Sequence, residues 1–194
     1  MWWRRPHQSA CRVAHLAWAA RLAVVVVAAG LTAGCWQPLY GEHGGPGSET
    51  VRDKLAAVEI PPIPAPHGSP TQRIAISLRN ALQYDLNGAA GANAPTHRLV
   101  VHVATTQITV TIDPTSGRPS GQIDSVVADF QLIEIVSNKT VLSANTYAHV
   151  DYDVPGVEQR FAKLRAQRDA EDHAVQMVAE TIRNRLASYF VAGT

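Results

Sequence analysis

Apolar residues recur every three or four positions in two stretches of the chain, 70–87 and 157–190. This spacing places them on one side of a helix, so the sequence predicts two amphipathic helices. Ser69 followed by Pro70 is a typical helix start, and Gly88 is a typical helix end. The second stretch contains no glycine or proline, which predicts a single long helix.

Alternating apolar and polar residues mark the strands of the predicted fold. A short apolar run at 54–60, closed by prolines, predicts a first strand, and three longer strands are predicted at about 99–112, 122–136 and 140–152. The parity of the apolar positions changes within the second strand, which predicts a β-bulge or bend at 104–107.

The third strand shows how the predicted sheet divides its two faces. The residues predicted on the apolar face are Val126, Ala128, Phe130 and Leu132, and those predicted on the polar face are Asp124, Val127, Asp129 and Gln131. One face then packs against helices and the other meets solvent or a partner. We expect an α+β two-layer sandwich in which two helices pack on a mixed or mostly antiparallel four-stranded sheet, in the order β-α-β-β-β-α.

The first 34 residues have the pattern of an export signal. Four arginines precede or flank an apolar run of 12 residues from 22 to 33, and a helix that crosses a bilayer needs about 20. The run ends in Leu31-Thr32-Ala33-Gly34-Cys35, which resembles a bacterial lipobox. This resemblance implies cleavage before Cys35 and attachment of diacylglycerol and a further acyl chain to that residue. The alternatives are a buried N-terminal helix and an unmodified buried cysteine.

The lipobox divides the chain into three segments. We expect a cleaved lipoprotein signal peptide at 1–34, a lipidated flexible tether at 35–53 and a single α/β domain at 54–192. Trp36 stands where enteric lipoproteins retained in the inner membrane carry Asp, which favours the outer membrane.

Charge and cysteine content exclude several classes of protein. The chain has a formal net charge of +1, with 17 basic and 16 acidic residues. Four basic and no acidic residues lie in 1–34, so 13 basic and 16 acidic residues remain, a net charge of −3. This weakly acidic body argues against nucleic acid as a partner. The two cysteines, Cys11 and Cys35, cannot form a disulfide framework or a zinc site.

Few residues suggest catalysis or metal binding. The sequence contains no P-loop, dinucleotide fingerprint, nucleophile elbow, HExxH or CxxC motif. His149, Asp151 and Asp153 share one face of a strand and are the best metal candidates, but that face is opposite the apolar one and is more typical of a solvated surface. Arg118 and Lys139, at predicted loop tips, are candidates for contacts with an anionic ligand. We therefore expect no enzyme activity, no catalytic residues, no metal, and no cofactor besides the lipid on Cys35.

Three segments resemble the alphaproteobacterial LptE family of lipopolysaccharide-assembly lipoproteins. Cys35-Trp36-Gln37-Pro38-Leu39-Tyr40-Gly41 is similar to the family's Cys-Gly-Phe-x-Pro-Leu-Tyr-Gly start, with Trp36 where glycine is common. Residues 73–82 contain Leu-Arg-Asn-Ala-Leu, as in the first helix of the family, and residues 160–172 resemble its C-terminal helix.

The resemblance implies an outer-membrane lipoprotein that plugs the lumen of a large β-barrel partner, LptD. Such a protein helps the barrel assemble and assists insertion of lipopolysaccharide into the outer leaflet, with direct lipopolysaccharide contact left open. Two other classes stay open: an auxiliary lipoprotein of another envelope transport or cell-wall synthesis complex, and a lipid- or metal-binding periplasmic enzyme.

Overall fold

The chain divides into two compact units, residues 1–41 and 42–194. The computed structural model describes residues 50–88, 93–154 and 160–192, all within the second unit. The predicted signal peptide, the lipobox and Cys35 lie outside the described residues.

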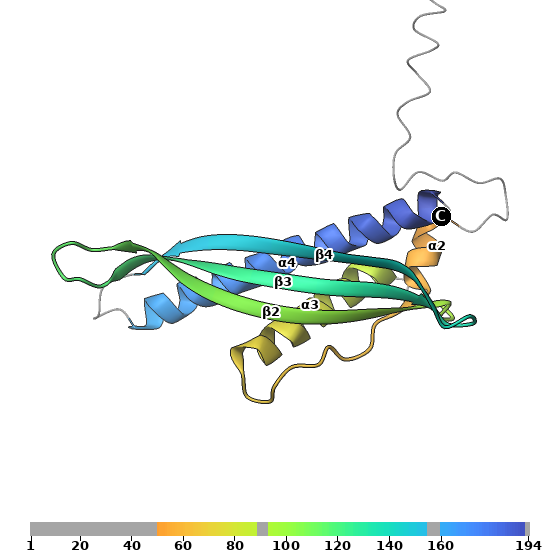
Figure 1. Cartoon of the computed structure of the whole chain (residues 1–194), viewed down its shortest axis with the longest axis horizontal. Coiled ribbons are helices and arrows are strands. Elements are labelled where there is room, and N and C mark those ends of the chain that lie inside the picture. The colour runs from red at the N-terminus through yellow and green to blue at the C-terminus, as the bar shows by residue number, and fades with distance from the viewer. Residues whose placement is uncertain (1–49, 89–92, 155–159, 193–194) are drawn as a thin grey trace, which may run out of the picture. The chain divides into compact units, whose positions relative to one another are not determined.

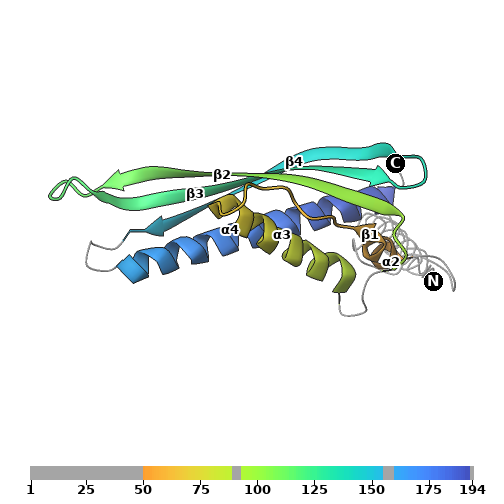
Figure 2. The same cartoon turned by 90° about the horizontal axis from the view of Figure 1, so that it is seen from below.

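The folded unit is a two-layer α+β sandwich, as predicted. A mixed four-stranded sheet has the order β1-β2-β3-β4, with β1 parallel to β2 and the other neighbours antiparallel. Helices α3 and α4 lie side by side on one face of this sheet (Figures 1 and 2). The elements in chain order are α2 (Val51–Ala56), β1 (Val58–Glu59), α3 (Pro70–Asn87), β2 (His97–Ile112), β3 (Pro119–Glu134), β4 (Lys139–Asp153) and α4 (Arg160–Ala192).

Branched and aromatic side chains of both layers form the core. Phe130 and Leu132 of β3 are almost completely buried, as are Leu78 of α3 and Ile182 and Leu186 of α4. Each such side chain contributes about 1.5–3 kcal/mol by leaving water, so this seam holds the helices on the sheet.

Helix α3 begins and ends where the sequence predicts. The Ser69 side chain accepts a hydrogen bond from the backbone N–H of Gln72 at 3.1 Å, and Pro70 occupies the first turn. Gly88, with φ of 59°, is the C-cap. The left-handed φ at this position is one that glycine adopts without steric cost.

The predicted first strand at 54–60 is wrong in most of its length. Residues 51–56 form helix α2, and β1 contains only two residues. Thr50 and Asp53 form a reciprocal capping box, in which each side chain accepts a hydrogen bond from the other's backbone N–H. This box starts a helix within the segment 35–53 that the sequence assigned to a flexible tether.

Strand β2 has no bulge at 104–107. Its pairing with β3 is regular from His97 to Thr109, and the register shifts only at Thr109, Thr111 and Ile112. There Gly121 faces Thr111, and a Cβ on this glycine would lie 3.2 Å from the threonine hydroxyl oxygen. The change of parity therefore has a different cause: Ile108, paired with Ile123, lies on the face of the sheet opposite Leu99 and Val101.

Helix α4 is continuous, but only part of its predicted apolar stripe is buried. The residues from Ala170 to Phe190 on this stripe pack on β3, β4 and α3. Phe161 and Leu164 are 89% and 51% exposed, although the sequence placed them on the same stripe. None of the helices among the described residues is both long and apolar enough to cross a membrane.

Candidate functional site

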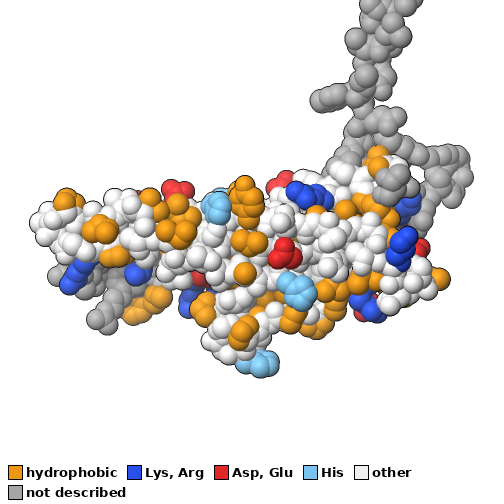
Figure 3. Space-filling model, in the orientation of Figure 1, with side chains coloured by type: hydrophobic (Ala, Val, Ile, Leu, Met, Phe, Trp, Pro, Cys, Tyr) orange, Lys and Arg blue, Asp and Glu red, His pale blue; other side chains and the backbone are white. Residues whose placement is uncertain are grey.

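The helices cover one face of the sheet, and the face of β2, β3 and β4 turned away from them is exposed (Figure 3). We call this the open face. It carries alternate residues of each strand, among them His102 on β2, Asp129 on β3 and Asn145 on β4. Hydrophobic side chains lie in several small groups along this view, one of them at the hairpin end, and charged side chains are fewer than uncharged ones. A surface of this composition is typical of a binding interface.

Three exposed aliphatic side chains lie at the end of β2, beside the tip of the β2–β3 hairpin. Ile108, Val110 and Ile112 are 54%, 59% and 59% exposed, and Ile108 is paired with Ile123 of β3. We call Ile108, Val110 and Ile112 the hairpin patch. These three β-branched residues lie close together on one exposed strand and are not scattered over the surface, so the patch is a candidate contact surface.

The loop after the hairpin patch is held by its own side chains. Asp113 accepts hydrogen bonds from the backbone N–H of Thr115 and from the Ser116 hydroxyl, both at 2.8 Å. These bonds hold the pKa of the Asp113 carboxyl below its usual value. The loop therefore has a defined shape at the tip of the β2–β3 hairpin.

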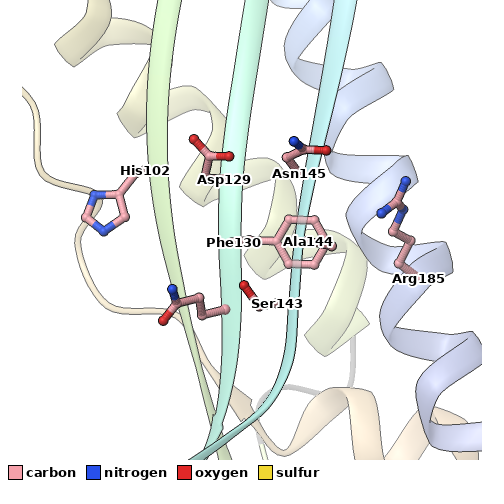
Figure 4. Close-up of a pocket in the computed structure, with 8 residues that line it drawn as sticks. His102, Asp129, Phe130, Ser143, Ala144, Asn145 and Arg185 are labelled. Atoms are coloured by element: carbon pink, nitrogen blue, oxygen red, sulfur yellow. The ribbon is translucent and has the colours of Figure 1, made fainter.

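Polar side chains occupy the middle of the open face. His102, Asp129 and Asn145 lie in a row across the three strands and line a shallow depression of about 560 Å³ (Figure 4). Along the same face, the His149 ring contacts the Tyr147 ring with centroids 4.9 Å apart and shares a hydrogen bond with the Ser125 hydroxyl. These groups offer hydrogen bonds and aromatic surface to a partner.

The three candidate metal residues do not come together as one site among the described residues. His149 is engaged with Ser125 and Tyr147, while Asp151 and Asp153 are exposed farther along β4. No group of three or more His, Cys, Asp or Glu side chains among the described residues is placed to hold a metal ion. His97 and His102 lie on opposite faces of β2, and the His97 ring packs edge-on against Phe190.

Arg118 and Lys139 cannot contact one small ligand. Arg118 lies in the loop before β3, and Lys139 begins β4 after it. The 16 residues of β3 separate them, which corresponds to about 50 Å at the usual rise of a strand.

The sequence interpretation misplaced Asp124, which belongs to the helix-covered face. It has the parity of Val126, is only 6% exposed and accepts a hydrogen bond from the Gln107 amide at 3.0 Å. The same amide donates to the Tyr152 hydroxyl, which donates to Gln122 at 2.9 Å. Strict alternation back from Val126 was the signal that would have placed Asp124 correctly.

Burial changes the acid–base properties of this cluster. Desolvation raises the pKa of the Asp124 carboxyl, and the hydrogen bond from Gln107 opposes that change. Burial, reinforced by the nearby Asp124 charge, raises the pKa of Tyr152 to about 12. One oxygen of Asp124 is buried without a hydrogen-bond partner.

Comparison with known proteins shows the fold. No protein-family model matches the chain, and no curated protein matches it. A candidate lipoprotein from Caulobacter crescentus is 19% identical, with a TM-score of 0.55 over 74% of this chain and 97% of its own. The rare lipoprotein B of Shewanella oneidensis is 16% identical, with a TM-score of 0.48 over 70% of this chain and 96% of its own. The chain thus has the fold of the Caulobacter protein along nearly all of that protein's length.

Proposed function

We propose that this protein is an outer-membrane lipoprotein, anchored through Cys35, that plugs and helps to assemble a β-barrel lipopolysaccharide translocon of the LptD type. In this role it assists the insertion of lipopolysaccharide into the outer leaflet. The role is structural and non-enzymatic, and the covalent lipid is its only attached group.

One observation carries the proposal: a domain with the fold of a candidate lipoprotein follows a lipobox in the same chain. The fold supports the class of protein, and the lipobox supports the anchor. Two or more acyl chains, at about 0.8 kcal/mol per buried CH₂, hold a protein on a membrane stably, whereas one chain does not.

The open face supports a role inside a partner. The lumen of a large barrel is polar, and a plug must meet it with side chains that form hydrogen bonds without carrying many charges. His102, Asn145 and Tyr147 offer such groups, and the hairpin patch supplies apolar contact at one end.

The proposal is tested by photo-crosslinking in intact envelopes. A photoreactive amino acid at Tyr147, which is 67% exposed on the open face, should crosslink to a large β-barrel protein. The same amino acid at Tyr84, which is 77% exposed on α3, is the matched control and should give much less of this product.

Affinity purification of the C-terminally tagged protein from detergent-solubilised envelopes gives the stoichiometry. A barrel recovered in equal amount agrees with the proposal. Recovery of an inner-membrane transporter or a cell-wall synthase without a barrel would overturn it and favour an auxiliary lipoprotein of that complex.

A further inference from the structure

A small cavity lies on the helix-covered side of the sheet, away from the open face. It has a volume of about 210 Å³, is partly open, and is bordered by the first turns of α3, by β2 and β3, and by α4. Asp124 and Gln107 line it from the sheet, and Gln167 and Glu171 line it from α4. The space is large enough for the head of one long side chain, and too small for a drug-sized ligand.

The cavity wall carries one carboxylate whose charge is not balanced by a neighbour. Glu171 forms an ion pair with Arg73 and accepts a hydrogen bond from the Gln167 amide at 2.9 Å. One carboxylate oxygen of Asp124 accepts a hydrogen bond from the neutral Gln107 amide. Its other oxygen is buried without a hydrogen-bond partner. The other residues that line the cavity are uncharged. A buried carboxylate in this state favours a cationic hydrogen-bond donor, because a charge-assisted bond offsets its desolvation.

An exposed apolar strip continues from the cavity along α4. Leu164 lies seven residues before Glu171 and therefore on the same side of the helix, about 10 Å along its axis. Phe161 lies one further turn away, and both side chains are largely exposed. The strip starts at the cavity and extends away from the core, so one extended segment of about five residues could span both.

We infer that this cavity and strip bind a segment of a partner protein that places one arginine or lysine against Asp124 and apolar side chains on Leu164 and Phe161. The basic residue of the partner segment is inferred from the unbalanced charge of Asp124. Its apolar residues are inferred from the exposed side chains of Leu164 and Phe161. The site lies on the opposite side of the sheet from the open face and requires neither the lipid anchor nor the barrel of the proposed function.

Methyl NMR of the full chain in detergent micelles tests the basic half of this site. Ile74 lines the cavity and Ile112 is exposed in the hairpin patch, so isoleucine methyl labelling reports on both places. N-acetyl-arginine amide should shift the Ile74 signal saturably, with a Kd of about 1 mM, and leave Ile112 unchanged. The neutral isostere N-acetyl-citrulline amide should bind at least about tenfold more weakly.

Matched variants assign the effect to Asp124. Asp124→Asn should abolish the shift, and Asp129→Asn, at an exposed position of the same strand, should leave it intact. Gln167→Arg places a competing guanidinium at the cavity wall and should also abolish it, without changing Asp124. An unchanged Ile182 signal shows that each variant keeps the core.

The apolar half is tested with N-acetyl-Arg-Leu-Leu amide. It should bind about tenfold more tightly than the single residue, and the combined Phe161→Ser and Leu164→Ser substitutions should remove that gain. Absence of saturation at about 20 mM, or equal binding by Asp124→Asn or by the citrulline isostere, would overturn the inference. Equal affinity for N-acetyl-arginine amide and N-acetyl-Arg-Leu-Leu amide would overturn the inference that a protein segment binds here, and would leave a site for a small cation.

Discussion

Asp124 shows at the residue scale how one buried carboxylate makes stability depend on pH. Burial raises its pKa in the folded state above the value of about 3.9 for an unfolded chain. The folded state therefore binds the proton more tightly, and the stability this provides is complete below the unfolded pKa. It is lost as the pH rises through the folded pKa.

The variant Asp124→Asn removes this dependence. The amide keeps an oxygen for the Gln107 hydrogen bond and never ionises, so the stability of the variant relative to the wild type should increase from about pH 4 to about pH 7. Urea unfolding at both pH values measures this difference. Asp129→Asn on the exposed face is the control and should show no comparable trend; the same trend there would contradict the assignment to Asp124.

At the element scale, the apolar stripe of helix α4 is exposed near the start of the helix and buried farther along it. Leu186→Ala should cost about 2–5 kcal/mol of unfolding free energy, because Leu186 is completely buried against the sheet. Leu164→Ala, at a position 51% exposed, should cost no more than about 0.5 kcal/mol. Chemical denaturation of both variants checks the contrast, and similar losses would mean that the first turns of α4 belong to the core.

The long elements were predictable from the sequence because their periodicity is strong and extends over many residues. Helix α3, with Ser69 and Gly88 at its ends, and the three long strands follow from local chemistry alone. The short elements were not predictable, since apolar residues in the segment 54–60 fit a strand as well as a helix, and the Thr50–Asp53 capping box decides between them.

The same limit applies to the candidate site. Ile108, Val110 and Ile112 were recognised as one face of a strand, but the sequence does not say that this face is the exposed one. That fact depends on which face of the sheet α3 and α4 cover. The cluster of Gln107, Asp124 and Tyr152 depends on the register of three strands, which no local pattern contains.

At the scale of the whole molecule, the proposed lipid anchor predicts that only one of the two cysteines, Cys35, carries lipid. Metabolic labelling with an alkyne fatty acid should mark the wild type and Cys11→Ser equally, because residue 11 leaves with the predicted signal peptide. Cys35→Ser should lose the label, since it lacks the thiol that lipidation requires. Gel fluorescence after coupling to a dye measures both, and full labelling of Cys35→Ser would contradict the lipobox interpretation.

Among the described residues, two backbone edges of the sheet have no neighbouring strand. Strand β1 pairs with β2 only at His97 and Arg98, and β4 pairs with β3 alone among the described strands. Such edges accept strands from other chains. The rate at which two free molecules of this protein associate depends on the square of its free concentration. The rate of capture by the proposed partner depends on the first power of that concentration. If the proposed partner exists, the balance between assembly with it and self-association depends on how much free protein accumulates, so synthesis of the two proteins would have to be matched.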